Sequence, residues 1–203
     1  MPGELTAKGR ATRGRIIEGA ASVLREMGIA RATLDDVMAR TGTSKSQLFH
    51  YFPGGKDELL VAVAQFEADR VLEDQQPYLG CLDSWRAWEQ WRDVVIDRYE
   101  AQGDECPLGA LFLQVGRSTP GARAIVIELL RSWQESLATG IRAMQAAGDL
   151  PSDLDVEARA AALLAAIQGG VSILLSTGRS THLRAALDQG IADLRRTGDV
   201  SRR

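Results

Sequence analysis

Four polar residues lie close together near the start of the chain, within the segment TSKSQLFHYF at positions 43–52. They are Lys45, Ser46, Gln47 and His50. A glutamine can pair bidentately with adenine, a lysine can reach guanine, and the N-terminus of a helix can receive a phosphate. These residue types suit contact with the major groove of double-stranded DNA. The alternative is the solvated face of a small helical hairpin, and spacing alone leaves both interpretations open.

Residues suited to catalysis are scarce in this sequence. Histidine occurs only at His50 and His182, and there is no Gly-rich phosphate loop, no paired-acid signature and no cluster with metal-ligand spacing. We therefore expect that the protein is not an enzyme and uses no metal or other cofactor. Two cysteines, Cys81 and Cys106, make no disulfide framework, which favours a cytoplasmic location. For Cys106, packing is a better interpretation than a redox role.

The elements that position the polar cluster are expected to be helices. No run of alternating β-branched residues occurs, so the chain is predicted to be all-α. A first helix is expected over residues 10–27, with Gly28 as a left-handed C-cap. A second helix of about eight residues follows the N-cap Thr33 and stops at Gly42.

The third helix carries the polar cluster itself. It is expected to begin at Thr43 or Ser44 and to end at Phe52, because Pro53 disfavours helical geometry at the residue before it. Leu48 and Phe52 share one face and should point inward. Two short helices joined by a Gly-containing turn are the outline of a helix-turn-helix.

Charge is distributed unevenly along the chain. The net charge is −3 overall, +2 for residues 1–60 and −5 for the remainder. A weakly basic head on an acidic body fits local contact with a polyanion. The basic residues before position 16 form either an arm that follows a nucleic-acid backbone or a solvated helix edge; they are Lys8, Arg10, Arg13 and Arg15.

The remainder of the chain is also predicted to be helical. The chain has 203 residues with 45% hydrophobic content, enough for a substantial core. Helices are expected over residues 56–75, 82–102, 107–117, 120–147, 155–177 and 181–196, followed by a polar tail. The stretch 160–177 has no charge and is long enough for a short membrane span, but Gln168, its glycines and its alanines favour a soluble helix at an interface. No membrane contact is expected.

The first sixty or so residues resemble the DNA-binding domain of TetR-type transcriptional regulators. The matching stretches are TLDDVMARTGTSKSQLFHYF, residues 33–52, and GGKDELL, residues 54–60. HYFPGGK, combined with CPLGAL at residues 106–111, is similar to the LmrA/YxaF-like branch of drug- and flavonoid-responsive repressors. The resemblance implies a three-helix helix-turn-helix head over residues 1–55. It also implies a helical ligand-binding and dimerisation body over residues 56–203.

The resemblance assigns roles to individual residues of the head. Thr33 would cap the second helix and face a phosphate, and the helix start at Thr43 and Ser44 would leave its amides free for phosphate. Ser44 and Tyr51 would contact backbone phosphates, and Lys56 would hold a phosphate beside the fourth helix. The residues that approach base edges would be Lys45, Ser46, Gln47 and His50.

One position departs from the family pattern. Phe49 stands where the family usually has tyrosine, so a hydroxyl that could contact phosphate is missing. We expect the Phe49 ring to pack in the core and to clamp the short helix to the head.

The body of the chain holds all four tryptophans. Aromatic residues with a few polar groups can line a pocket for an apolar small molecule, and ordinary core packing is the alternative for each. The candidate pocket residues are Trp88, Leu111, Phe112, Gln114, Trp133, Met144 and Gln168. The candidate residues of a dimer interface are Leu163, Ile167, Gly170, Ile173, Leu174 and Leu187.

These features together predict a ligand-responsive, homodimeric transcriptional regulator. We expect a repressor that binds a palindromic operator through two recognition helices and is released by a small hydrophobic effector, such as a planar aromatic compound. The alternative is a DNA-binding protein controlled by a protein partner rather than by a small molecule.

Overall fold

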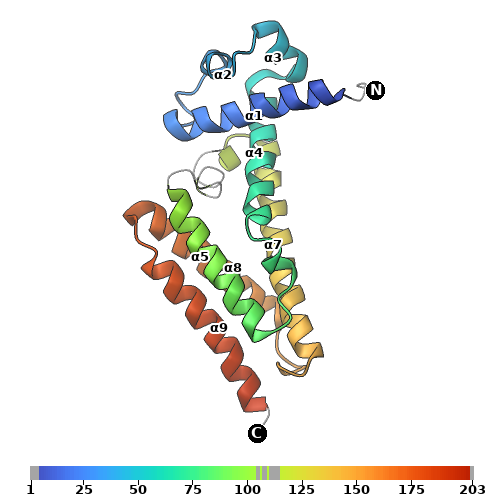
Figure 1. Ribbon diagram of the computed structural model, residues 1–203, viewed down its shortest axis with the longest axis vertical. Helices are drawn as coiled ribbons and strands as arrows, with labels where there is room; N and C mark the ends of the chain where they lie inside the picture. The colour runs from blue at the N-terminus through green and yellow to red at the C-terminus, as the bar shows by residue number, and fades with distance from the viewer. Residues whose placement is uncertain (1–4, 104–105, 107–108, 110–114, 202–203) are drawn as a thin grey trace. The chain divides into compact units, whose positions relative to one another are not determined.

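The computed structural model describes residues 5–103, 106, 109 and 115–201. Within these residues the chain is helical and has no strand, which confirms the all-α prediction (Figure 1). The elements are α1 (Ala7–Met27), α2 (Leu34–Thr41), α3 (Lys45–Tyr51), α4 (Gly55–Glu73), the 3-10 turn η1 (Tyr78–Gly80), α5 (Trp85–Gln102), η3 (Val115–Arg117), α7 (Pro120–Ala146), α8 (Val156–Thr177) and α9 (Thr181–Ser201).

Two compact units divide the chain. The first contains Met1–Arg70 and Ala110–Ile127, and the second contains Val71–Gly109 and Glu128–Arg203. The division therefore falls inside α4 and inside α7. The functional division expected after residue 55 stays a prediction.

The short helices of the first unit are fixed by local caps. The Thr33 hydroxyl accepts a hydrogen bond from the Asp36 amide at 3.2 Å, and the Asp36 carboxylate accepts one from the Thr33 amide at 2.8 Å. This reciprocal capping box begins α2. Gly42 ends α2 at φ 60° and ψ 32°, a left-handed conformation that suits glycine. The predicted limits of α2 are confirmed.

Other helix ends differ from the predictions. α1 begins at Ala7 rather than at position 10, because the Thr6 side chain caps it by accepting a hydrogen bond from the Gly9 amide. Gly28 follows α1 with φ 75° but ψ 153°, so it is not the left-handed C-cap that was predicted. α9 continues to Ser201, five residues past its expected end. The predicted helix at residues 107–117 lies largely outside the described residues.

A buried acidic residue joins α4 to α1 in the first unit. The side chain of Glu67 is fully buried (0% exposed), forms an ion pair with Arg25 and lies 3.5 Å from an Arg70 nitrogen. The Arg25 side chain is only 12% exposed. A buried carboxylate needs such partners, because desolvation of an uncompensated charge is costly.

A second, exposed ion pair joins α1 to α2. Arg40 donates to both carboxylate oxygens of Glu26, at 2.7 and 2.6 Å. The hydrogen bonds from Arg40 and Ser22 lower the pKa of Glu26 from 4.5 to about 2. A carboxyl group whose pKa is lowered by folding stabilises the fold above its unfolded pKa, and this contribution disappears as the pH falls through the folded pKa.

We therefore expect the Glu26–Arg40 pair to survive mild acid. An NMR titration of the Glu26 side-chain carboxyl should give a midpoint near the folded pKa of about 2. In Arg40→Gln the midpoint should rise towards the ordinary value of 4.5, because the two strongest hydrogen bonds are lost. Equal midpoints in the two proteins would contradict this account of the pair.

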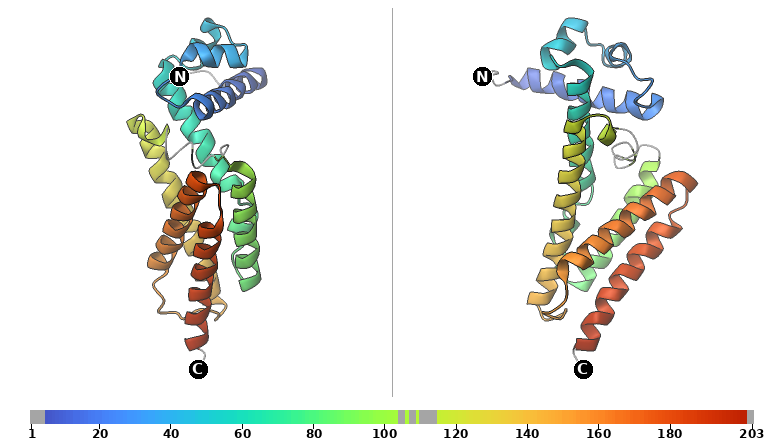
Figure 2. Two further views of the ribbon diagram at one scale, coloured as in Figure 1. Left: turned by 90° about the vertical axis from the view of Figure 1, so that its left-hand side faces the viewer. Right: turned by 180° about the vertical axis from the view of Figure 1, so that it is seen from behind.

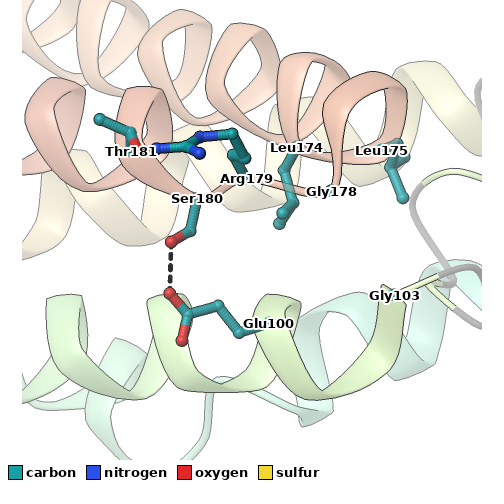
Figure 3. Close-up of a pocket in the computed structure, with 8 residues that line it drawn as sticks. All are labelled: Glu100, Gly103, Leu174, Leu175, Gly178, Arg179, Ser180 and Thr181. Atoms are coloured by element: carbon teal, nitrogen blue, oxygen red, sulfur yellow. Dashed lines mark hydrogen bonds between the residues drawn. The ribbon is translucent and has the colours of Figure 1, made fainter.

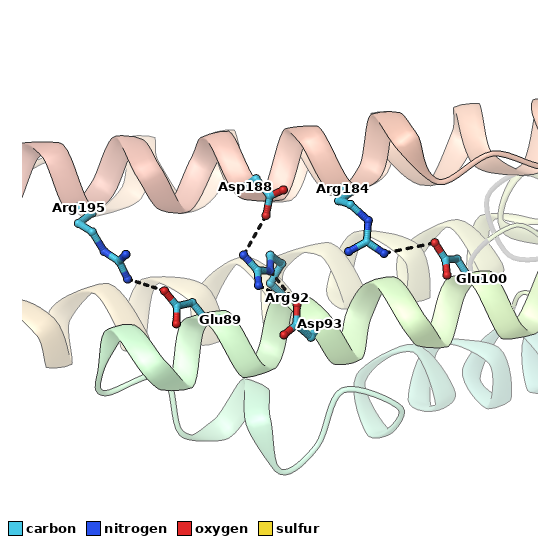
Figure 4. Close-up of polar contacts among 7 residues, drawn as sticks. All are labelled: Glu89, Arg92, Asp93, Glu100, Arg184, Asp188 and Arg195. Carbon is cyan, nitrogen blue, oxygen red and sulfur yellow. Dashed lines mark hydrogen bonds and ion pairs between the residues drawn. The ribbon is translucent and has the colours of Figure 1, made fainter.

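In the second unit, α8 and α9 lie side by side in every view (Figure 1, Figure 2). Their close approach depends on glycine. A Cβ atom at Gly170 would lie 2.6 Å from the Leu183 Cα atom, and one at Gly190 would lie 2.5 Å from a Leu163 methyl carbon. Three ion pairs also connect α9 to α5: Arg195–Glu89 at 2.8 Å, Arg92–Asp188 at 2.9 Å and Arg184–Glu100 at 3.5 Å (Figure 4).

The packing of α8 against α9 bears on the six residues expected at a dimer interface. Five of them are buried in the chain itself: Leu163, Ile167, Gly170, Leu174 and Leu187. Gly170 contacts Leu183 of α9, so this small residue serves an intrachain helix crossing. Ile173, 36% exposed, is the member of the set that remains available to a partner.

α8 is long and apolar enough to cross a membrane by length and composition, with a mean hydropathy of 1.7. Within the 18-residue stretch of α8 that meets these criteria, 39% of the residues are buried inside the fold. A core helix of a soluble protein satisfies the same criteria, so this property of α8 is weak support for a membrane span.

Candidate nucleic-acid interface

The recognition-helix candidate, α3, is attached by one face only. Leu48 is 0% exposed, and Phe52, its C-cap residue, is also buried. At about 100° per residue, Ser46 and His50 project within about 20° of the direction opposite Leu48. All four side chains of the predicted base-reading set are exposed: Lys45, Ser46, Gln47 and His50. The helix therefore presents these four polar side chains to solvent, with the partly exposed Phe49 ring between Lys45 and Ser46 around the helix.

A second capping box begins α3. The Ser44 hydroxyl accepts a hydrogen bond from the Gln47 amide at 3.2 Å, while the Gln47 side-chain oxygen accepts one from the Ser44 amide, also at 3.2 Å. This arrangement confirms the predicted helix start. It also means that Gln47, one of the candidate base-reading residues, takes part in the cap of its own helix.

Two threonines that were expected at the DNA surface have internal partners. The Thr33 hydroxyl donates to the Asp36 carboxylate at 2.6 Å, in addition to its capping bond. Thr43 is buried and accepts a hydrogen bond from the Thr41 hydroxyl at 2.8 Å. The Thr33 hydroxyl proton is used by Asp36 and the Thr43 side chain is buried, so both residues act within the fold as the structure describes it.

Lys56 is likewise engaged inside the first unit. Its ammonium group donates to the carbonyl oxygens of Ile29 at 3.1 Å and Ala32 at 2.6 Å. Both acceptors belong to the segment between α1 and α2, which the sequence pattern of α4 gave no reason to place nearby. Lys56 thus ties the start of α4 to this segment with two of the three N–H donors of its ammonium group.

We expect Lys56→Met to destabilise the protein by about 2 kcal/mol, because hydrogen bonds to a charged group are worth about 1.5–3 kcal/mol. Urea denaturation followed by circular dichroism measures this loss. The salt dependence of DNA binding should stay unchanged in Lys56→Met and should fall in the exposed control Lys45→Met. If Lys56→Met were as stable as wild type and its DNA binding depended less on salt, Lys56 would instead be assigned to a phosphate contact.

The core position expected for Phe49 is wrong. Phe49 is 39% exposed, because Leu48 and Phe52 occupy the inner face of the short helix and position 49 falls on its flank. The ring lies beside the start of α4, where a Cβ on Gly55 would be 3.6 Å from it. Tyr51 is half-buried and packs edge-on against His50, with ring centroids 4.9 Å apart.

The basic residues of the N-terminal segment belong to α1 and are not an extended arm. Arg13 stacks over the Phe52 ring at 5.1 Å, Arg15 donates to the Thr41 carbonyl, and Arg10 donates to the Leu5 carbonyl. The sequence pattern did not reveal these internal contacts, because each partner except Leu5 is far away in the chain. Lys8 is exposed.

The predicted pocket residues lie in the second unit or outside the described part of the chain. Trp88, Trp133 and Met144 are fully buried in α5 and α7, and Gln168 is half-buried in α8. Within the part of the chain that the structure describes, three buried donors among them have no hydrogen-bond partner: Trp88 Nε1, Trp133 Nε1 and Gln168 Nε2. By contrast, Trp91 Nε1 donates to Gln75 at 3.0 Å. The predicted residues outside the described part are Leu111, Phe112 and Gln114.

A cavity of about 430 Å³ lies where the end of α5 faces the turn between α8 and α9 (Figure 3). Ser180 donates to Glu100 across it, and Leu174, Arg179 and Thr181 contribute to its wall. Its described lining includes none of the predicted pocket residues. The cavity is therefore a separate feature of the body.

Cys106 is buried and is not part of a disulfide. It lies near Tyr99, whose pKa is raised well above its ordinary value by burial and further by the charges of Cys106 and Asp74. A buried thiol is poorly accessible to an oxidant, so packing remains the better interpretation of Cys106.

The fold and the exposed α3 face define a helix-turn-helix transcriptional regulator, and comparisons with known proteins identify its family. A model described as "Bacterial regulatory proteins, tetR family" matches residues 16–63, and one described as "Tetracyclin repressor-like, C-terminal domain" matches residues 85–189. The second match alone covers just over half of the chain. The protein therefore belongs to the TetR family. The LmrA/YxaF-like branch stays a prediction.

Relatives with a known sequence or structure agree with this assignment. An HTH-type transcriptional regulator of Mycobacterium tuberculosis is 27% identical over 110 residues, which are 51% of this chain and 53% of the relative. The chain thus spans about half the length of that curated relative. The family and these relatives are transcriptional regulators rather than enzymes.

Two solved structures show the same fold. A TetR transcriptional regulator from Chloroflexus aurantiacus superposes with a TM-score of 0.77 at 24% identity, covering 92% of this chain and 96% of that one. SmeT in complex with triclosan gives 0.72 at 19% identity, covering 90% and 91%. SmeT is the repressor of the Stenotrophomonas maltophilia multidrug efflux pump SmeDEF.

Proposed function

We propose that the protein is a cytoplasmic, homodimeric repressor that binds a palindromic operator and is released by a small hydrophobic effector. The observation that carries the proposal is the solvent-exposed polar face of α3, a seven-residue helix held to the fold through buried Leu48. Such a helix can enter a major groove with its outer side chains directed at base edges.

The DNA contacts in this proposal come from α3 and its cap. The residues directed at base edges are Lys45, Ser46, Gln47 and His50. Ser44 and Tyr51 contact phosphates at the two ends of the helix. Thr33, Thr43 and Lys56 support the surface through their internal hydrogen bonds.

Dimerisation is proposed to use the outer face of α8. Its exposed residues are uncharged, and all of them except Ile173 are small: Ala158, Ala161, Ala162, Ala165, Gly169, Ser172, Ile173 and Ser176. A shallow hollow of about 310 Å³ beside this face, between α8 and α9, includes Ala166 and Gly190 and can receive side chains of a second copy. An exposed apolar face of this kind favours association, and two copies related by a two-fold axis match a palindrome.

The proposed effector is a hydrophobic, planar aromatic compound with hydrogen-bond acceptors. Support comes from three buried donors that have no partner among the described residues, Trp88 Nε1, Trp133 Nε1 and Gln168 Nε2. Buried donors are normally paired, so an acceptor on a ligand or on ordered water would satisfy them. The fold shared with SmeT, solved with triclosan, is consistent with a ligand in the body.

Release of the operator requires that the effector bind two states of the dimer with different affinity. α4 contains the division between the two units, after Arg70, so a change in its second-unit part would reach the head along one continuous helix. The competing mechanism is control by a protein partner. It is favoured by the complete burial of Trp88, Trp91 and Trp133, which fits a solid body.

Two titrations test these proposals. Fluorescence anisotropy with the DNA upstream of the protein's own coding sequence should show binding about 10³-fold tighter than to a shuffled duplex of the same composition. Equal affinities for the two duplexes would contradict operator binding. Planar hydrophobic compounds should change tryptophan fluorescence and weaken operator binding. If they change neither the fluorescence nor the operator affinity, the protein-partner mechanism is favoured.

A further inference from the structure

We propose that Gln47 reads guanine rather than adenine in the operator, because the capping box of α3 occupies its amide oxygen and leaves only its amide nitrogen for the DNA. The inference rests on the proposed operator binding.

The amide oxygen of Gln47 already has two donors. The Ser44 backbone N–H donates to Oε1 at 3.2 Å, and the Ser44 hydroxyl lies 3.4 Å from the same atom. A carbonyl oxygen has two lone pairs, so these donors saturate it. Nε2 of the same amide has no acceptor in the part of the chain that the structure describes, and the side chain is exposed. Gln47 therefore presents two N–H donors and no acceptor.

The two purines respond differently to a donor-only group. In the major groove guanine offers two neighbouring acceptors, N7 and O6, whereas adenine offers the acceptor N7 beside the donor N6. Pairing with both adenine atoms requires the glutamine oxygen and nitrogen together. That pairing would break the capping box, so the folded head favours guanine.

The capping box of α2 supports this division of roles. Asp36 occupies the same capping position there and closes its box with a carboxylate, which has no N–H group. A cap therefore needs only an acceptor at this position. At Gln47 the amide supplies the acceptor and adds a donor that the cap does not use.

Gln47→Glu is the matched variant for a test, because it keeps the capping acceptor and removes the donor. Wild type and variant are each used to select from a library of random-sequence DNA duplexes. We expect wild type to enrich a guanine at one position of each half-site. Gln47→Glu should lose that preference and turn towards cytosine, whose N4 amino group donates to a carboxylate. The control Asp36→Asn alters the cap of α2 and should keep the guanine.

A second measurement uses wild type alone, so it does not depend on the folding of a variant. Replacing the selected guanine by 7-deazaguanine, which lacks the N7 acceptor, should weaken binding about 10-fold. The inference is overturned if wild type selects adenine there, if Gln47→Glu keeps the guanine preference, or if 7-deazaguanine has no effect. Failure of wild type to enrich any sequence would instead overturn the proposed operator binding, and the inference with it.

Discussion

Ala165→Glu is expected to convert the proposed dimer into monomers and to weaken operator binding about 10³-fold, to the level of non-specific DNA. Ala165 is exposed at the middle of the uncharged α8 face. In a dimer built on this face the glutamate would be buried between two copies, and burial of a charge without a compensating partner is strongly unfavourable. Light scattering coupled to size exclusion measures the mass, and anisotropy measures the affinity.

Ala101→Glu is the matched control for this prediction. It makes the same substitution at an exposed alanine of α5, away from the α8 face. The control should remain a dimer with unchanged operator affinity. A dimeric Ala165→Glu protein with full operator affinity would contradict the prediction and would show that the dimer interface lies on another surface.

Glu67→Gln is expected to lower the free energy of unfolding by about 3–5 kcal/mol, because removing one member of a buried ion pair is strongly destabilising. Here the affected partner is Arg25, only 12% exposed, opposite a fully buried Glu67. Since α4 and α1 meet through this pair, the loss should appear as cooperative unfolding at lower urea concentration. Circular dichroism during urea denaturation measures it.

An exposed ion pair supplies the control for Glu67. Glu128 and Arg131 lie one helical turn apart in α7 and are 61% and 66% exposed. Glu128→Gln should lower the urea midpoint of unfolding far less than Glu67→Gln, because exposed ion pairs contribute little to stability. An equally small loss of unfolding free energy in Glu67→Gln and Glu128→Gln would contradict this prediction. The buried Glu67–Arg25 pair would then contribute no more to stability than an exposed pair.

Local signals made the head predictable from the sequence. Thr33 and Ser44 are N-caps that act on amides three residues away, and Gly42 ends α2 through its own backbone geometry, so each could be read from neighbouring residues. The exposed polar side chains of α3 could also be predicted, because Leu48 and Phe52 are four residues apart and mark the inner face of the helix. These features depend on a few consecutive residues and not on the rest of the fold.

Long-range contacts were not predictable in the same way. Lys56 bonds to carbonyl groups 27 and 24 residues earlier in the chain, and nothing in the sequence around it specifies those acceptors. Gly170 was correctly seen to permit close approach of a helix, but the helix that approaches is α9 of the same chain. In both cases the residue type indicated a capability, and tertiary packing decided which partner used it.

The central claim, that α3 contacts DNA through its exposed face, is tested most directly by a double variant. Lys45→Ala/Tyr51→Phe removes one charge and one hydroxyl while keeping the buried Leu48 and the aromatic ring at position 51. Anisotropy at several salt concentrations, with the DNA upstream of the coding sequence, should show binding at least about 10-fold weaker and a salt slope lower by about one unit. Equal affinity and equal salt slope in wild type and double variant would contradict the assignment of α3 as the DNA-reading helix.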